Sequence, residues 1–316
     1  MMVRLAIVIT LSAWEAFANA APFAYISNQG SNNVSVIDTA SDRVVATVAV
    51  GAKPVGVATA PGTQRVYITN PEDHTVSVID ASKNRVVATV PVGQSPLGIA
   101  LHTTRAYIAD WDLDQVAILD TQSLKITGVI AVGRSPSGLA LDASGKRLYV
   151  ANRDDHNLAV IDTASMSTLA TIKVGAAPFG VTVNPKGDRV YVANVRSNKV
   201  SVIDTGKLAL LGHVEVGESP YAIALDADRN RLFVTNQHED TVSVVDLGAM
   251  KVIATIPVSG YPEGIAIHPG RDRVYVANWF TNEVQVIDTG TLKIAASIPT
   301  GDGSRAFGQF IALAPL

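Results

Sequence analysis

The chain has no cysteine among its 316 residues. Disulfide bonds, thiolate metal sites and haem attachment through C-x-x-C-H are therefore excluded. An excess of positive charge is lacking too, because the formal net charge is −3. A mildly acidic chain has no long-range field that would draw it to nucleic acid.

Long apolar runs and catalytic motifs are also missing. No apolar run near the length of a membrane helix occurs in the chain, so no membrane span is predicted. Nor does the sequence contain G-x-S-x-G, H-E-x-x-H or a phosphate-binding glycine loop. No recognised catalytic motif therefore supports an enzymatic function, and we expect a protein that is not an enzyme.

The first twenty residues have the three parts of a secretory signal peptide. Met1 to Arg4 carry a positive charge, Leu5 to Ala13 are apolar, and Ala18-Asn19-Ala20 offers small residues for cleavage after Ala20. We therefore predict a signal peptide over residues 1–20 and export to the periplasm or the exterior. Residues 21–316 are predicted to form one domain, and we expect a monomer.

A tetrad of the type Tyr-x-x-Asn recurs along almost all of the remaining sequence. Successive tetrads are 42 residues apart, with one interval of 40, and they begin at Tyr25, Tyr67, Tyr107, Tyr149, Tyr191, Phe233 and Tyr275. A second marker, a V-S-V-I-D type run, also occurs seven times, ending at Asp38, Asp80, Asp120, Asp162, Asp204, Asp246 and Asp288. A period of about 40–45 residues in a strand-rich sequence is typical of propeller blades. The sequence predicts an all-β, seven-bladed propeller.

Each repeat unit predicts four antiparallel strands, a to d. In the fifth unit they cover residues 180–183, 189–193, 199–203 and 208–216, separated by turn residues. The first three are rich in β-branched residues, and the fourth is the most polar, as suits an outer edge. The first unit begins at strand b, and residues 309–315 resemble a strand a with nothing after it. We expect this C-terminal strand to join the N-terminal blade and close the ring, which would remove the exposed sheet edges.

The repeat also resembles a known family. Residues 67–70 (YITN) and 191–194 (YVAN), with V-G-x-x-P-x-G and V-S-V-I-D-T, resemble the YVTN-type β-propeller repeat family. That resemblance implies an exported bacterial propeller, similar to surface-layer and periplasmic propellers and more distantly to propeller domains of bacterial redox enzymes. One enterobacterial periplasmic relative is associated with single-stranded DNA binding. The resemblance carries no catalytic residue over to this chain.

Residues that recur in every unit serve the scaffold, so function is expected where one unit departs from the others. The strand-end aspartates, for example, are predicted to be turn formers. Loops a–b and c–d share one face of the propeller, and loops d–a and b–c share the other, which we call the top face. The aromatic residues outside the tetrads and strands all fall on the top face: Trp111, Phe179, Tyr221, Tyr261, Trp279, Phe280 and Phe307.

Aromatic side chains on loops favour a binding site. With Glu263 and Arg305, which belong to neighbouring units, these aromatics form our predicted ligand-binding set. The alternative is that the aromatic side chains plug the channel.

The residue that follows the loop proline also varies between the units. It should point toward the channel mouth, and it reads Val55, Leu97, Ser137, Phe179, Tyr221 and Glu263, with Phe307 or Gln309 as the seventh member. Glu263 is the acidic member of this series. It could hold a cationic ligand or act as a general acid or base, or it could form a salt bridge with Arg305.

Asp110, Asp112 and Asp114 are the candidate metal ligands. Their D-x-D-x-D spacing resembles the start of a calcium loop, but the glycine and the distal glutamate of that loop are missing. The pattern therefore favours a solvated acidic loop over a divalent-cation site, and no cofactor is predicted.

We expect a non-catalytic exported propeller whose top face binds a small molecule or a periplasmic protein, as an accessory to a periplasmic enzyme system. The first alternative is a metal-assisted lyase or lactone hydrolase at the channel mouth, with Glu263 as its catalytic residue. The second is single-stranded nucleic-acid binding by stacking on tryptophan. Basic residues of the top face are interleaved with acidic ones, which argues against that second alternative.

Overall fold

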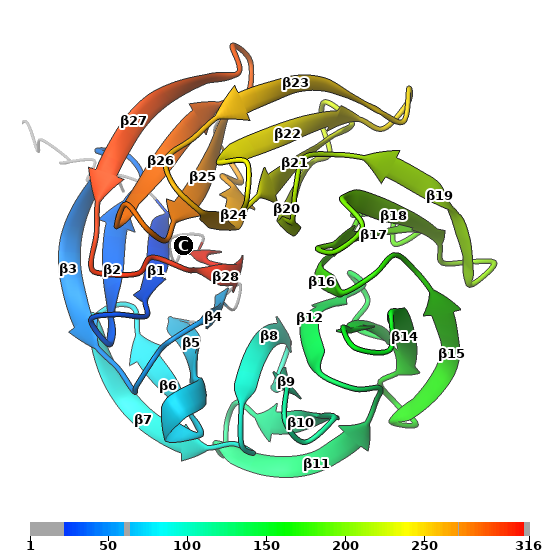
Figure 1. Cartoon of the computed structure of the whole chain (residues 1–316). Coiled ribbons are helices and arrows are strands. Elements are labelled where there is room, and N and C mark those ends of the chain that lie inside the picture. The colour runs from blue at the N-terminus through cyan, green and yellow to red at the C-terminus, as the bar shows by residue number, and fades with distance from the viewer. Residues whose placement is uncertain (1–21, 60–63, 271, 313–316) are drawn as a thin grey trace, which may run out of the picture.

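The computed structural model describes residues 22–59, 64–270 and 272–312, and the predicted signal peptide lies outside them. Seven sheets stand around a central channel, as Figure 1 shows, and six of them have four strands. This confirms the predicted all-β, seven-bladed propeller. Among the described residues no helix is both long and apolar enough to cross a membrane.

The strands follow the predicted a-to-d order. Blade 1 holds β1 (Phe23–Asn28), β2 (Asn33–Asp38), β3 (Arg43–Ala49) and the late strand β29 (Ile311–Ala312). Blade 2 holds β4 (Gly56–Thr59), β5 (Arg65–Asn70), β6 (Thr75–Asp80), β7 (Arg85–Pro91) and the late strand β28 (Phe307–Gln309), with the 3₁₀ helix η1 (Pro71–Asp73) between β5 and β6.

The other five blades are formed by consecutive strands. Blades 3 and 4 consist of β8 (Pro96–His102), β9 (Arg105–Asp110), β10 (Gln115–Asp120), β11 (Lys125–Ala131), β12 (Pro136–Leu141), β13 (Arg147–Asn152), β14 (Asn157–Asp162) and β15 (Ser167–Lys173). Blades 5 to 7 consist of β16 (Pro178–Val183), β17 (Arg189–Asn194), β18 (Lys199–Asp204), β19 (Ala209–Glu215), β20 (Pro220–Asp226), β21 (Arg231–Asn236), β22 (Thr241–Asp246), β23 (Lys251–Pro257), β24 (Pro262–Ile267), β25 (Arg273–Asn278), β26 (Glu283–Asp288) and β27 (Lys293–Pro299).

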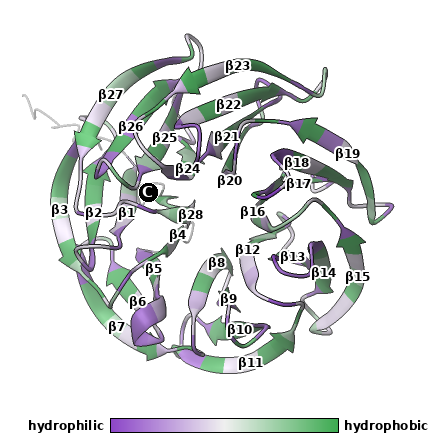
Figure 2. Cartoon of the chain, in the orientation of Figure 1, coloured by the Kyte–Doolittle hydropathy of each residue, from purple (hydrophilic) through white to green (hydrophobic). Residues whose placement is uncertain are grey.

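Hydrophobic residues of the second and third strands form the core between blades. In blade 5, β17 and β18 are buried over almost their whole length, whereas β19 at the outer edge is mostly exposed. Figure 2 shows hydrophobic residues along the inner and the outer strands alike and a hydrophilic η1. The tetrad aromatics are buried too, and burial, together with the charge of Asp80, raises the pKa of Tyr25 to about 12. The tetrad aromatics are core residues, in line with the scaffold role expected of residues that recur in every unit.

The aspartates that end the third strands form turns. Asp204 Oδ1 accepts hydrogen bonds of 2.9 Å from the backbone N–H groups of Gly206 and Lys207. Those donors lower the pKa of the Asp204 carboxyl, the bond from Lys207 contributing most. The same turn occurs at Asp120, Asp162 and Asp288. These interactions support the scaffold role expected for the repeated aspartates.

Glycine at the start of the inner strands permits close contact between neighbouring blades. A Cβ atom on Gly98 would lie 2.2 Å from the Ser137 carbonyl oxygen of the next blade, and one on Gly56 would lie 2.1 Å from the Leu97 oxygen. The last glycine of V-G-x-x-P-x-G is therefore needed for packing around the channel rather than for the turn alone.

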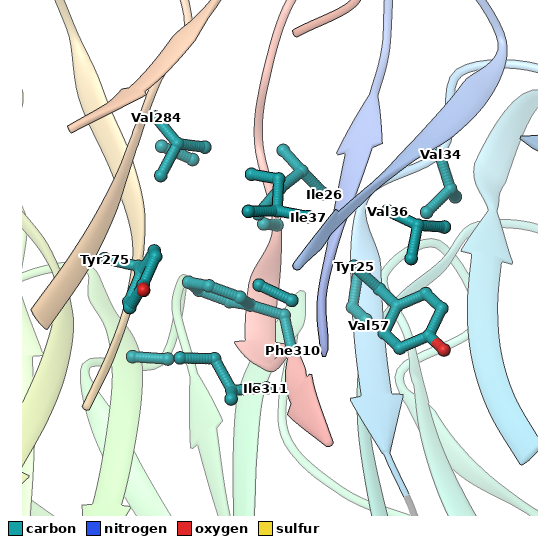
Figure 3. Close-up of a cluster of buried hydrophobic side chains, with 14 of the residues drawn as sticks. Tyr25, Ile26, Val34, Val36, Ile37, Val57, Tyr275, Val284, Phe310 and Ile311 are labelled. Atoms are coloured by element: carbon teal, nitrogen blue, oxygen red, sulfur yellow. The ribbon is translucent and has the colours of Figure 1, made fainter. Parts of the chain in front are cut away.

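The C-terminal segment closes the ring, as predicted, and it does so in two steps. β29 pairs antiparallel with β1, and Phe310 lies between Tyr275 of blade 7 and the β1 residues (Figure 3). Just before it, β28 pairs in parallel with β4 of blade 2, a pairing that the repeat pattern did not predict. Gly308 allows this bend, because its φ is 118° and a Cβ there would lie 2.5 Å from the Val57 carbonyl oxygen.

Candidate binding site at the channel mouth

A hollow of about 550 Å³ opens where the d–a and b–c loops meet. Two series of equivalent positions supply most of its wall. The position after the loop proline contributes Leu97, Phe179, Tyr221 and Glu263. The position after the tetrad contributes Trp111, Arg153, Val195 and Gln237. Every blade has these two positions, but the residue there differs from blade to blade. Most of the wall therefore consists of residues that are not shared by the repeats.

Arg305 is the seventh member of the series that follows the loop proline. Ser304 forms a bridge with Asn28, as Pro220 does with Asn236 in blade 6. The following Ala306 N–H donates to Ser27 Oγ, just as Ala222 N–H donates to Thr235 Oγ1. The prediction of Phe307 or Gln309 for this position was wrong, because the closing segment bends toward β4 only after Ala306.

Glu263 and Arg305 form a buried ion pair across blades 7 and 1. Arg305 Nε donates to Glu263 Oε2, and its Nη2 donates to Glu263 Oε1 at 3.0 Å and to the Tyr221 hydroxyl at 2.9 Å. Gln237 Nε2 also donates to Glu263 Oε1, at 3.1 Å. Burial raises the pKa of Glu263, and the guanidinium opposes that shift. The salt-bridge alternative is thus the one that the structure contains, with both carboxylate oxygens occupied.

The rings of Phe179, Tyr221 and Phe307 contact one another beside the hollow. The rings of Phe179 and Tyr221 are 4.2 Å apart and 28° from parallel, and Phe307 lies 5.0 Å from Phe179. Each of the three is only 5–6 % exposed. Phe307 also lines a second cavity, of about 510 Å³, that is surrounded by the inner strands. Phe179 and Tyr221 therefore line the hollow, whereas Phe307 lines the cavity between the inner strands.

The other predicted aromatics lie at the edge of the hollow. Trp111 lines it, with its ring 6.3 Å from that of Phe179. Tyr261 lines it as well and contacts Trp279 at 5.7 Å and Phe280 at 4.9 Å between ring centres. Trp279 and Phe280 do not line the hollow, and Phe280 is 65 % exposed. We call Tyr261, Trp279 and Phe280 the rim cluster.

Several polar residues of the wall were missed from the sequence: Arg153, Arg196, Ser219, Gln237 and His238. The predicted set contains mainly aromatic residues and residues at or near the position after the loop proline. Arg153 and Gln237 occupy the same post-tetrad position as the two tryptophans that drew attention to it. Comparing that position across all seven repeats would have found them.

The three candidate metal ligands have separate partners. Asp110 is fully buried, and its carboxylate accepts hydrogen bonds from the backbone N–H groups of Gln94 at 2.7 Å and Ser95 at 3.0 Å. Asp112 accepts from the Ser95 hydroxyl, and Asp114 accepts from the Ser135 N–H at 2.8 Å. Asp110, at the asparagine position of its tetrad, thus fastens the d–a loop that precedes β8. Within the described ranges no three His, Cys, Asp or Glu residues group as metal ligands would.

Solved structures of several proteins share this fold. Hydrazine synthase of Kuenenia stuttgartiensis matches with a TM-score of 0.76 and 21 % identity, over 84 % of this chain and 92 % of that one. A functionally unknown protein from Desulfotomaculum acetoxidans DSM 771 matches with a TM-score of 0.78 and 15 % identity, over 91 % and 100 %. The dihydro-heme d1 dehydrogenase NirN, solved in complex with DHE, matches with a TM-score of 0.65 and 14 % identity, over 90 % and 74 %. At these identities the likeness concerns the fold alone.

The comparison with curated proteins gave no match. A family model, in contrast, covers nearly the whole chain, from residue 6 to residue 310. It describes a seven-bladed propeller family, in agreement with the blades and the ring closure described above. The finer YVTN-type resemblance stays a prediction. The chain belongs to the YNCE-like beta-propeller family.

Proposed function

We propose that the protein is a non-catalytic binding protein whose ligand is a small molecule held in the hollow at the channel mouth. The proposal rests on the shape and lining of the hollow. It has a volume of about 550 Å³ and is lined by aromatic side chains and a few convergent polar groups. Small-molecule sites commonly have this size and this mixture of residues. Most of the wall consists of positions whose residue differs from one repeat to the next.

Binding is favoured over catalysis because of how Glu263 is held. A general acid or base must exchange a proton with the substrate. Both oxygens of Glu263 instead accept hydrogen bonds from Arg305 and Gln237, and the residue is 2 % exposed. The predicted export through residues 1–20 would place this binding protein in the periplasm or the exterior, where it could serve an enzyme system as an accessory.

A thermal-shift screen of small metabolites tests the proposal. Ligands that bind the native state raise the unfolding temperature by mass action. We expect hits on the unchanged protein to be lost when Trp111→Ala and Tyr261→Ala are combined, because both side chains line the hollow. Phe280→Ala is the matched control, since this aromatic side chain lies outside the wall. If every hit survives the double substitution, the hollow is not the binding site and the proposal fails.

A second candidate function, protein binding, is favoured by the rim cluster. Phe280 is 65 % exposed and contacts both Tyr261 and Trp279. Exposed aromatic side chains are enriched at protein interfaces. Two single variants separate the candidates: a protein partner that docks on the rim would be lost with Phe280→Ala and retained with Trp111→Ala.

A further inference from the structure

The charged groups that line the hollow do not balance. Three guanidinium groups, those of Arg153, Arg196 and Arg305, face one carboxylate, that of Glu263. Arg305 and Glu263 neutralise each other through two hydrogen bonds. Of the other two, Arg153 forms an ion pair with Asp154, which lies outside the hollow, and Arg196 has no ion-pair partner among the described residues. The two arginines lie on the neighbouring blades 4 and 5.

Arg153 is held in place against an aromatic wall. Its guanidinium carbon lies 5.4 Å from the ring centre of Trp111, within the range of a cation–π contact. Its Nη1 donates to Asp154 Oδ1 at 2.9 Å, and Asp154 does not line the hollow. Because a guanidinium carries five N–H donors, these contacts leave donors for another group.

Arg196 is the more available cation. Its side chain is exposed, and throughout the described ranges it makes no ion pair or side-chain hydrogen bond. Its backbone N–H donates to the Ala176 carbonyl oxygen at 3.1 Å, which fixes the start of the side chain beside Val195 on the wall. An arginine whose fork-shaped donor set is free suits a planar carboxylate, which it can bind through two parallel hydrogen bonds.

The apolar part of the hollow is made largely of flat rings. Phe179 and Tyr221 stack at 4.2 Å, and Trp111 lies at the side of Phe179 with its plane tilted by 51°. Leu97 and Val195 are the aliphatic lining residues. Rings of this kind favour a flat ring system through offset stacking and edge contacts.

We propose that the hollow binds a planar organic anion, an aromatic carboxylate whose ring lies against Trp111 and Phe179 while its carboxylate meets Arg153 and Arg196. The inference rests on the proposed function and adds the chemical class of the ligand. A cationic ligand would face two arginines without a free acid. A neutral aromatic ligand would use the rings but leave the Arg196 donors without an anion.

Three probes of the same shape test the class: 2-naphthoate, 2-naphthamide and 2-naphthylmethylammonium, titrated calorimetrically into the full chain. We expect naphthoate to bind about tenfold more tightly than the amide, and the ammonium compound to bind most weakly. Equal affinity for the three compounds would overturn the inference, and so would failure of naphthoate to bind.

Arginine variants locate the carboxylate. Arg196→Gln should lower naphthoate affinity severalfold, toward that of the amide, because Arg153 remains, and it should leave amide binding unchanged. Arg85→Gln is the matched control, because Arg85 is exposed on the outer strand β7. An unchanged naphthoate affinity in Arg196→Gln would also overturn the inference.

The two proposals fail in different ways. If the amide or the ammonium compound binds as well as naphthoate and is lost with Trp111→Ala plus Tyr261→Ala, the hollow is a binding site and only the anion class is wrong. If the metabolite screen yields no ligand that depends on Trp111 and Tyr261, the proposed function itself is wrong.

Discussion

Glu263 and Arg305 occupy the same position of neighbouring blades and are one 42-residue repeat apart. Their side chains are 3 % and 18 % exposed. Taking charged groups out of water costs several kcal/mol each, and their attraction offsets this only when the geometry and the remaining hydrogen bonds are good. Here Tyr221 and Gln237 supply those additional hydrogen bonds. The pair therefore depends on both of its members.

Arg305→Met is expected to lower the free energy of unfolding by about 3–5 kcal/mol at neutral pH, because Glu263 would stay buried without its cation. The loss should shrink as the pH is lowered. Burial already raises the pKa of Glu263 above its ordinary 4.5, and removal of the guanidinium raises it further. An acid with a raised folded-state pKa disfavours the native state increasingly as the pH rises above the unfolded value. Urea unfolding at several pH values measures this.

The double variant Arg305→Met with Glu263→Gln is the control for charge. Since it has no buried carboxylate at position 263, it should regain part of the lost stability and lose the pH dependence. A deficit in Arg305→Met that is independent of pH would show that packing, rather than the unpaired carboxylate, accounts for the loss.

The glycines at the start of the inner strands decide how closely neighbouring blades approach each other. Gly98→Ala should reduce stability by about 1–3 kcal/mol, because its Cβ would lie 2.2 Å from a backbone oxygen that cannot move aside alone. Gly212→Ala on the outer strand β19 is the control, since a Cβ there meets no atom within 4 Å. Thermal unfolding of both variants gives the comparison. Equal effects would contradict a packing role for Gly98.

The strands could be predicted from the sequence because each repeat has the same order of strand-forming runs and turn residues. The four strands of blade 5 begin and end within a few residues of their predicted bounds, and the seven markers fix the number of blades. The parallel pairing of β28 with β4 could not be predicted. It occurs once, and it depends on the glycine at position 308 and on packing between distant segments.

The sequence contains the information that places several of the missed wall residues, namely their equivalent positions in the repeats. A strict 42-residue step from Glu263 leads to Arg305, which the structure places in the same series. Arg153 and Gln237 stand at the tryptophan position of their repeats. The burial of Phe307 had no such signal, because it follows from the bend that carries the closing segment across the channel.

Side-chain contacts between neighbouring blades recur around the ring. Arg65 Nη1 donates to the Thr121 carbonyl oxygen of the next blade at 2.7 Å, and Arg147 Nη1 donates to that of Thr205 at 2.6 Å. Between blades 7 and 1 the equivalent Arg273 forms an ion pair with Asp42, which also accepts a 2.7 Å hydrogen bond from the Tyr275 hydroxyl. The seam of the ring is therefore fastened by side chains as well as by β29.

The strand contribution to that seam can be removed by ending the chain after Gly303. The truncation deletes β28 and β29, exposes the edges of β1 and β4, and removes the fully buried Phe310. It also leaves Glu263 without Arg305. Loss of a buried phenylalanine side chain alone costs about 3–5 kcal/mol, a large share of the 5–15 kcal/mol that stabilises a typical domain. We expect loss of cooperative thermal unfolding, with aggregation through the open edges.

A chain that ends after Ala312 is the matched control, because it keeps both late strands, Arg305 and Phe310. It should unfold cooperatively near the temperature of the full chain, as judged by calorimetry and circular dichroism. If the chain cut after Gly303 does the same, the side chains at the seam suffice to hold blades 7 and 1 together. β29 would then add a strand to blade 1 without being required for closure, and the cost of the missing strands would have to appear locally, as faster hydrogen exchange in β1 and β4.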